Sequence, residues 1–454
     1  MPAHVTDSIF FRDLYGTPEM RAIFDDMALL QKWLDYEAAL ARAEASVGLV
    51  PPEAALAITR AAVADKFDTT AIKAGIDKTV HPLVSVIWQL SELCEGDGGR
   101  YVHWGATTQD VMDTALVLQV KDAYAALEKT LSDLITALAK QAAAHRDTLM
   151  AGRTHGQQAL PITFGYKVAV WLAEMRRHAA RLTESKGRVL VGEFGGAVGT
   201  LASVREHGFA IQAALMRELG LGLPPIAWHT ARDGFAEFTH ILGMISATCG
   251  KIAHEVIDLQ KSEFGEVEEP FELGKVGSST MPHKRNPMLA EAILTLARLT
   301  RRQSAAALDA MLHEHERDWS SFQMEWAFIP EVCIMTHGAL ALTVRVMEGL
   351  IVYPENMARN TQVTHGAWLA ERVMLALGKF IGRQHAHDVV YEAAMHAFEH
   401  GEPMADVLKR DARVMDHLSA AEIDGLLDPA QYTGLAAEMV DRVLKAQADS
   451  AASS

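Results

Sequence analysis

One polar segment of the chain combines hydroxyls, cations and a helix start, which together could bind and activate an anion. The segment 274–287 reads GKVGSSTMPHKRNP. Its closing Asn-Pro is typical of a helix N-cap followed by the first helical residue. A helix start, exposed backbone amides and a lysine are the usual components of an anion site, although the same pattern fits a surface loop with a well-capped helix. The candidates here are Ser278, Ser279, Lys284 and Asn286.

Three further polar segments interrupt the helical pattern, and we interpret each as a loop: 102–110 (VHWGATTQD), 151–161 (AGRTHGQQALP) and 191–200 (VGEFGGAVGT). Loops on a rigid scaffold often carry chemistry. Thr107 and Thr108 could hold a carboxylate, or Thr108 could cap the next helix. His155 is a candidate general acid or base because histidine titrates near neutral pH, but a structural role is also open.

The spacing of these residues argues against several common kinds of site. The glycines of 191–200 are not spaced as in dinucleotide-binding loops and follow no clear strand. Neither His313–Glu316 nor the pair His385 and His387 has a typical metal-ligand spacing, so we expect no metal and no other cofactor. Gly277–Ser279 does not match the nucleophile elbow of the α/β-hydrolases.

Long helices must position these segments, because apolar residues recur with helical spacing along most of the chain. Three apolar stripes stand out, at 116–138, 164–182 and 235–259. The first lies in a run, 111–151, without Pro or Gly, which as a helix could span roughly 50–60 Å. Strand signals are weak, and Val189–Val191 is the best short candidate. The pattern predicts an all-α helical bundle.

Helix breakers divide this pattern into parts. They occur at Pro51-Pro52, at Gly96–Gly99 and at Pro354. We therefore expect an N-terminal helical domain at 1–110, a central long-helix domain at 111–350 and a C-terminal helical domain at 351–454.

Composition indicates a globular protein whose main partner is neither nucleic acid nor an anionic membrane. Of the 454 residues, 49% are apolar and 22% charged, as in ordinary soluble domains. The net charge of −16 opposes binding to nucleic acid or to an anionic membrane. The three cysteines are far apart, which favours a reducing compartment. Residues 1–10 lack the apolar core of a signal peptide, and apolar runs such as 332–344 are too short to span a membrane. We expect a cytoplasmic protein.

The segment 277–287, GSSTMPHKRNP, resembles the signature loop GSSxMPxKxNP of the fumarase/aspartase superfamily. The likeness continues in PEMRAIFDD (18–26), GATTQD (105–110), GRTHGQ (152–157) and LQKSEFGEVEE (259–269). The most similar branch contains adenylosuccinate lyase and 3-carboxy-cis,cis-muconate cycloisomerase. The resemblance implies three helical domains, a twenty-helix core in a homotetramer, and active sites built from loops of three subunits.

The resemblance also implies a reaction and roles for individual residues. The shared chemistry is β-elimination from a succinyl group with release of fumarate. Ser278 matches the base, and His155 matches the residue that protonates the leaving nitrogen in adenylosuccinate lyases. The positions implied to bind substrate are Thr107, Thr108, His81, Ser279, Lys284, Asn286 and Arg317.

Two departures from the pattern of adenylosuccinate lyases concern the substrate. Leu14-Tyr15 stands where those enzymes carry Arg-Tyr, and Trp228 replaces a glutamine, so a nucleotide substrate is disfavoured. The segment 228–233, WHTARD, resembles the bacterial cycloisomerases, which lack a histidine at the position of His155. We therefore expect a cofactor-free C–N lyase acting on a small dicarboxylate or tricarboxylate, such as an iminodisuccinate-like N-substituted aspartate. A lactonising 3-carboxy-cis,cis-muconate cycloisomerase is the alternative, and a non-catalytic helical scaffold is the alternative of another class.

Overall fold

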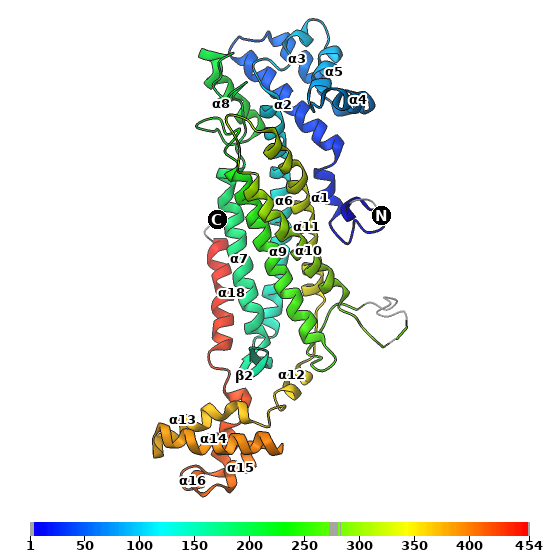
Figure 1. Ribbon diagram of the computed structural model, residues 1–454. Coiled ribbons are helices and arrows are strands. Elements are labelled where there is room, and N and C mark those ends of the chain that lie inside the picture. Colours follow the sequence, from blue (N-terminus) through cyan, green and yellow to red (C-terminus); the bar gives the residue numbers. More distant parts are fainter. Residues whose placement is uncertain (1–3, 272–279, 282, 453–454) are drawn as a thin grey trace. The chain divides into compact units, whose positions relative to one another are not determined.

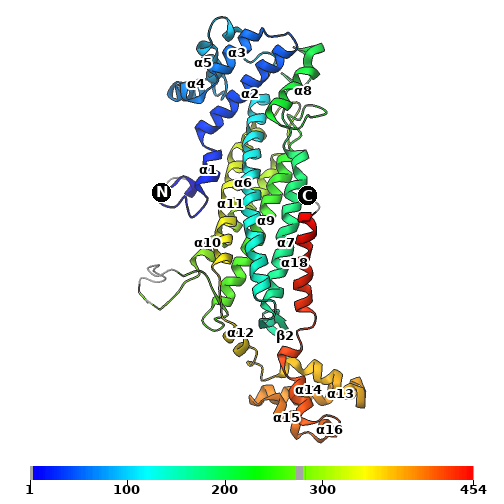
Figure 2. The same ribbon diagram turned by 180° about the vertical axis from the view of Figure 1, so that it is seen from behind.

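The computed structural model describes residues 4–271, 280–281 and 283–452, and helices α1 to α18 make up most of this part. The predicted all-α class is confirmed. Figures 1 and 2 show these helices and the few short strands. The chain divides into two compact units. Unit 1 comprises Met1–Ser132, His178–Gly250 and Leu294–Ala341, and unit 2 comprises Asp133–Arg177, Lys251–Ile293 and Leu342–Ser454. The domain edges near 110 and 350 stay predictions.

Five long helices each contribute residues to both units: α6 (Thr108–Ala144), α7 (Phe164–Val189), α9 (Asp233–Gln260), α10 (Met288–Asp309) and α11 (Trp319–Glu348). The three predicted apolar stripes fall in α6, α7 and α9, as expected. Stripe residues such as Leu127, Leu172 and Phe238 are fully buried. The stripes therefore form helices because one face of each is removed from water.

Unit 1 adds a set of shorter helices to its share of the long ones: α1 (Pro18–Ile23), α2 (Asp26–Ser46), α3 (Pro52–Ala61), α4 (Thr69–Thr79), α5 (Val84–Leu93) and α8 (Gly208–Leu219). Helix α2 packs against α3 and α8 around a common apolar core. Polar side chains also join the long helices inside this unit. His337 of α11 contacts Thr130 of α6 at 2.8 Å and Thr17 at 2.7 Å.

Unit 2 contains the strands β1 (Leu149–Thr154), β2 (Gln157–Thr163), β3 (Val267–Glu268) and β4 (Ile351–Val352). They form two antiparallel pairs, β1–β2 and β3–β4. Its shorter helices are α12 (Pro354–Asn360), α13 (Ala370–Ile381), α14 (Arg383–His400), α15 (Met404–Arg410), α16 (Ala412–Met415), α17 (Ala420–Leu426) and α18 (Ala436–Ala452). Residues of α13 to α17, including Leu377, Val389 and Ile423, enclose a separate apolar core.

Two local expectations about strands and loops were wrong. The segment 151–161 is a β-hairpin rather than a loop, with Leu149 opposite Thr163 and Thr154 opposite Gln157. Backbone pairing makes this hairpin from residues that do not alternate in polarity, so the period-two signal of a strand is missing. Val189 ends helix α7, and Val191 makes only an isolated bridge to Gly222.

Helix α11 is long and apolar enough, by length and composition, to cross a membrane. However, 61% of its most apolar window is buried inside the protein. Buried residues such as Phe322, Val332 and Leu340 give it the character of a core helix.

Candidate active site

In unit 1, the loop before α6 places a hydroxyl against a histidine. Thr108, the first residue of α6, lies with Oγ1 3.3 Å from Nε2 of His81. The ring of Trp319 stacks on His81, with 6.4 Å between the centroids. Burial and the nearby charge of His103 lower the pKa of His81, which favours a neutral ring. Its Nδ1 is buried and has no hydrogen-bond partner among the described residues.

Arg317 belongs to the same group of side chains and is held on two sides. Its Nε donates to Oε1 of Gln109 at 2.8 Å, and Nη1 donates to the carbonyl oxygen of Ala197 at 2.9 Å. Its Nη2 is buried but unpaired within the described part of the chain. A buried guanidinium nitrogen in this state is suited to an anionic ligand such as a carboxylate.

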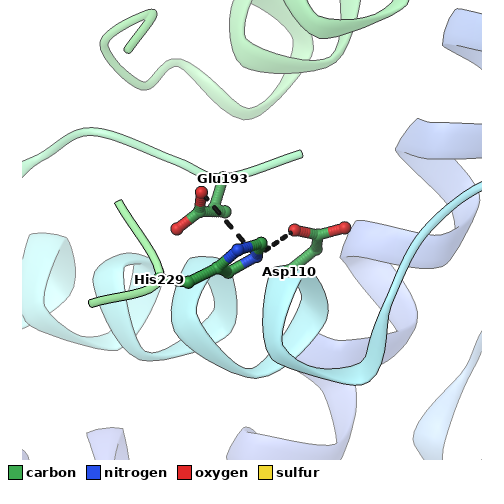
Figure 3. A group of neighbouring side chains, drawn as sticks. All are labelled: Asp110, Glu193 and His229. Carbon is green, nitrogen blue, oxygen red and sulfur yellow. Dashed lines mark hydrogen bonds and ion pairs between the residues drawn. The ribbon is translucent and has the colours of Figure 1, made fainter. Parts of the chain in front are cut away.

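Asp110 fixes the loop that carries Thr107. Its carboxylate accepts hydrogen bonds from the backbone amides of Thr107 at 2.9 Å, Gly195 at 3.0 Å and Gly196 at 2.9 Å. Its Oδ1 also lies 2.8 Å from Nε2 of His229 (Figure 3). One buried carboxylate thus joins the two polar segments 102–110 and 191–200, so the second segment supports the first.

Asp110, Glu193 and His229 have the residue types of a metal site, and their ligand atoms lie close together (Figure 3). The oxygens of Asp110 already accept from three backbone amides, and Oε1 of Glu193 accepts from the amide of Trp228 at 2.8 Å. Burial, with the charges of Asp113 and Asp110, raises the pKa of Glu193 to about 9. A protonated carboxyl and an already saturated one are poor ligands, so this cluster is better explained as the support of the loops.

In unit 2, the hairpin β1–β2 presents His155 at its tip. His155 and Gly156 are the two turn residues, with φ of 52° and 76°. Two positive φ values in a two-residue turn are typical of type I′ hairpins. The side chain of His155 is exposed on the isolated chain, where it is accessible to a substrate or to another subunit. A non-glycine residue in this conformation is uncommon, and such residues concentrate at functional sites.

An ion pair holds the hairpin in place. Arg153 binds Glu266 with two hydrogen bonds, of 2.7 and 3.0 Å. Glu266 is fully buried and also accepts from Nδ2 of Asn360 at 2.8 Å. A bidentate pair of this kind fixes direction as well as distance. The segment 259–269, which the sequence identified only by likeness, therefore positions the strand that leads to His155.

The signature segment is described only in part, and Ser278 and Ser279 lie outside the described residues. Lys284 and Asn286 line an open cavity of about 750 Å³ together with Arg285 and Tyr353.

Two carboxylates support this side of the cavity. Glu268 accepts from Arg285 at 2.9 Å and from the hydroxyl of Tyr353 at 2.7 Å. Glu269 accepts from the first amides of α10, those of Leu289 and Ala290, and so caps the helix.

The structure thus brings the candidate residues into separate groups. His81, Thr107, Thr108 and Arg317 share one polar site in unit 1. Lys284 and Asn286 line one cavity in unit 2, and His155 stands on the hairpin of that unit. Whether each residue acts in catalysis stays a prediction.

Sequence reasoning missed a set of buried residues that support the unit 1 site, namely Asp113, Arg232 and Glu325. The one available signal was charge inside apolar helical stripes. Asp113 stands in α6, Arg232 directly before α9, and Glu325 in α11.

Comparison with known proteins agrees with this fold. A family described as lyase matches residues 15–299, and a family described as adenylosuccinate lyase C-terminus matches residues 366–443. The chain is 44% identical to an N-acetyl-S-(2-succino)cysteine lyase of Enterococcus italicus, over 98% of each chain. It is also 44% identical to a 3-carboxy-cis,cis-muconate cycloisomerase of Pseudomonas aeruginosa, over 94% of this chain and 93% of that one.

A solved structure extends the likeness to three dimensions. The crystal structure of the 3-carboxy-cis,cis-muconate lactonizing enzyme from Pseudomonas putida superimposes with a TM-score of 0.91 at 39% identity, covering 96% of this chain and 98% of that one. Fold and sequence together define an enzyme of the lyase class. The chain belongs to the fumarase/aspartase superfamily, in the branch of adenylosuccinate lyase and 3-carboxy-cis,cis-muconate cycloisomerase.

Proposed function

We propose that this enzyme releases fumarate from a 2-substituted succinate by β-elimination. Ser278 removes a proton from the carbon next to one carboxylate, and the electron pair of that C–H bond is delocalised onto this carboxylate. The pair then forms the carbon–carbon double bond as the bond to the substituent breaks, and the leaving heteroatom takes the bonding pair together with a proton from His155. Family membership and the intact signature segment support this assignment.

Stabilising the intermediate is the main physical demand of this reaction. Proton removal beside a carboxylate gives a doubly charged aci-carboxylate, which fixed cations and hydrogen-bond donors must stabilise. Lys284 and Asn286, on one wall of the unit 2 cavity, meet this requirement. Charge from Lys284 also favours the deprotonated form of the Ser278 base.

The polar site of unit 1 is suited to the other carboxylate of a succinyl group. The unpaired Nη2 of Arg317 is a charged donor, and Thr107 and Thr108 add neutral donors nearby. Charged hydrogen bonds to a carboxylate are about twice as strong as neutral ones. We therefore assign the substrate as a small polycarboxylate that contains a succinyl group.

His155 is the observation that carries the choice of a lyase over a lactonising cycloisomerase. An elimination with a nitrogen or sulfur leaving group needs a proton donor, and the hairpin presents a histidine on an exposed, conformationally fixed turn. The leading substrate is an iminodisuccinate-like N-substituted aspartate with C–N cleavage. The similarity to an N-acetyl-S-(2-succino)cysteine lyase favours S-(2-succino) compounds as a second candidate class.

A nucleotide substrate fits less well. Leu14, at the position of a phosphate-binding arginine in adenylosuccinate lyases, is an exposed apolar residue. Trp228, at the position of a glutamine, is engaged inside the protein, because its Nε1 donates to the carbonyl oxygen of Gly192 at 2.9 Å. The guanidinium of Arg232 lies 4.9 Å from the Trp228 ring.

We further propose that the enzyme is a cytoplasmic homotetramer whose active sites combine loops of three subunits. Two features of a single chain support active sites that are shared between subunits. The candidate residues fall into separate groups, and the tip of the hairpin with His155 is exposed on the isolated chain.

A product assay on a panel of substrates tests the proposed function. Purified enzyme is incubated separately with iminodisuccinate, N-acetyl-S-(2-succino)cysteine, adenylosuccinate and 3-carboxy-cis,cis-muconate, and fumarate and muconate are quantified. We expect fumarate from one or both of the first two compounds, and little turnover of adenylosuccinate. Rapid loss of the muconate, with fumarate from none of the others, would establish the cycloisomerase instead.

A further inference from the structure

The guanidinium of Arg317 is held so that one edge is left for a ligand. Gln109 accepts from Nε and Ala197 accepts from Nη1, whereas Nη2 is buried and unpaired within the described chain. Because the guanidinium is planar, two hydrogen bonds on adjacent edges also fix the direction of the third nitrogen. The positions of Gln109 and Ala197, which accept from the other two nitrogens, therefore set the direction of Nη2.

Gln109 is itself held in one orientation. Its Nε2 donates to the carbonyl oxygen of His229 at 2.8 Å and to Oδ2 of Asp113 at 3.1 Å. If the amide were flipped, its oxygen would face these two acceptors and its NH₂ group would face the N–H of Arg317. Only the observed orientation pairs every group, so Gln109 presents an acceptor to Arg317 at all times.

A buried ion cluster fixes Asp113 in turn. Arg232 binds Asp113 with two hydrogen bonds of 2.8 Å, and its other edge binds Glu325, with a distance of 2.9 Å from Nε. All three side chains are at most 2% exposed. The rings of Trp228, Phe235 and Phe322 surround the guanidinium at 4.9, 5.2 and 5.6 Å. Such a cluster is rigid because any displacement exposes an unpaired charge to an apolar surrounding.

We propose that Gln109 is a positioning residue, which transfers the orientation of the Asp113–Arg232–Glu325 cluster to Arg317 and thereby aims its unpaired edge at a substrate carboxylate. Gln109 acts through Arg317 and needs no contact with the substrate. The proposal rests on the proposed function, which makes Arg317 a substrate-binding residue.

A double-mutant cycle on Gln109 and Arg317 tests this proposal. The variants are Gln109→Met, Arg317→Met and the double variant, in the full-length enzyme. KM and kcat are measured on whichever panel substrate the wild type converts, and the dissociation constant of fumarate is measured by calorimetry. Gln119→Met is the matched control, because Gln119 is a buried glutamine of the same helix whose amide donates to Ile23 at 2.8 Å.

The cycle predicts strong coupling. Losing the direct charged contact in Arg317→Met should raise KM and the fumarate dissociation constant about 100-fold, and Gln109→Met should raise them about tenfold. The double variant should match Arg317→Met, at about 100-fold rather than about 1,000-fold, because coupled residues are not additive. The loss should appear in KM more than in kcat, and Gln119→Met should change neither.

Other outcomes distinguish a failure of the positioning role from a failure of the proposed function. Multiplying effects in the double variant, or unchanged binding in Gln109→Met, would overturn the positioning role while leaving the proposed function intact. Fumarate from no substrate would overturn the proposed function. KM and kcat of the same variants would then be measured with the muconate as the substrate. If Gln109→Met does not fold, Gln109→Asn replaces it, since its shorter side chain cannot reach both partners and should raise KM in the same way.

Discussion

Arg317 and His155, which we expect to touch different parts of the substrate, are held in different ways. Arg317 depends on four other side chains from three segments, because Gln109, Asp113, Arg232 and Glu325 form one connected polar network. His155 depends on backbone geometry, since a two-residue turn fixes its position. A side-chain contact can be removed by one distant substitution, whereas the turn can be removed only locally.

Replacing the proposed base should abolish catalysis and spare the fold. Ser278→Ala is expected to lower kcat by about 100- to 10,000-fold, since a general base contributes roughly 10²–10⁴ to the rate. Thermal unfolding and the size of the oligomer should stay nearly unchanged. Fumarate release, together with a circular dichroism melt, measures both effects. Substantial residual turnover in a folded Ser278→Ala enzyme would show that another residue is the base.

The role of His155 as an acid predicts a dependence on the leaving group. His155→Asn should slow the release of a basic amine by about 100-fold or more, because the amine cannot leave without a proton. An activated leaving group, such as a nitrophenolate-like substituent, needs no proton and should be affected much less. Single-turnover rates on matched succinyl compounds measure the ratio. Equal losses for both kinds of substrate would argue against an acid.

The sequence could identify residues that interrupt the helical periodicity. It could not identify pairs of residues that lie far apart in the chain and contact each other in the fold. Thr107, Thr108 and His155 stand in polar segments outside the helical periodicity, and these segments are visible without a structure. The partners Asp113 and Arg232 are 119 positions apart, and each looks like an isolated charge in its own segment. Long-range pairing of this kind depends on which helix faces meet.

At the scale of the elements, the loop before α6 is held from two sides. Asp110 binds its backbone near Thr107, and further back His103 lies 2.6 Å from a carboxylate oxygen of Glu37 in α2. His103 has a positive φ of 59°, so the backbone turns sharply at this point. The His103–Glu37 pair therefore fixes the entry of the loop and contributes to the stability of unit 1.

This pair predicts a pH dependence of stability. Burial lowers the pKa of His103, but the charge and hydrogen bond of Glu37 and the charge of Asp110 together outweigh it, so the net pKa is raised. The contribution of a histidine with a raised pKa is fully present below its unfolded pKa of about 6.5 and is lost as pH rises through the folded value. Urea unfolding between about pH 6 and pH 9 should therefore show a falling free energy of unfolding.

A substitution isolates this effect. His103→Gln keeps a donor for Glu37 but cannot titrate, so the fall should become shallower, with the high-pH stability within about 1–2 kcal/mol of the wild type. His337→Gln is the matched control, because burial lowers the pKa of His337 and its contribution is lost at low pH instead. An unchanged slope in His103→Gln would contradict the role of the ion pair.

Element prediction succeeded for the helices and failed for the hairpin for one physical reason. In α6, α7 and α9, burial of one face forces the helical repeat into the sequence. In β1–β2, the determining contacts are backbone hydrogen bonds, the turn at His155-Gly156 and the Arg153–Glu266 pair. These interactions leave little trace in the order of apolar and polar residues.

At the scale of the whole molecule, the proposed catalytic and binding residues lie in separate parts of the chain. The proposed base and its cationic neighbours belong to one segment, the proposed acid to the hairpin, and the carboxylate-binding group to unit 1. We propose that these residues meet between the subunits of a symmetric oligomer. The central claim is that every active site is completed by loops of neighbouring subunits.

Complementation between two inactive variants tests this claim most directly. Ser278→Ala and His155→Asn proteins are unfolded, mixed in equal amounts and refolded, and fumarate release is compared with that of each variant refolded alone. If the two residues come from different chains, random mixing restores about a quarter of the sites, since each position is intact with a probability of about one half. Activity near a quarter of the wild-type value is the predicted result. A mixture no more active than its components would contradict the account, because both residues would then come from the same chain.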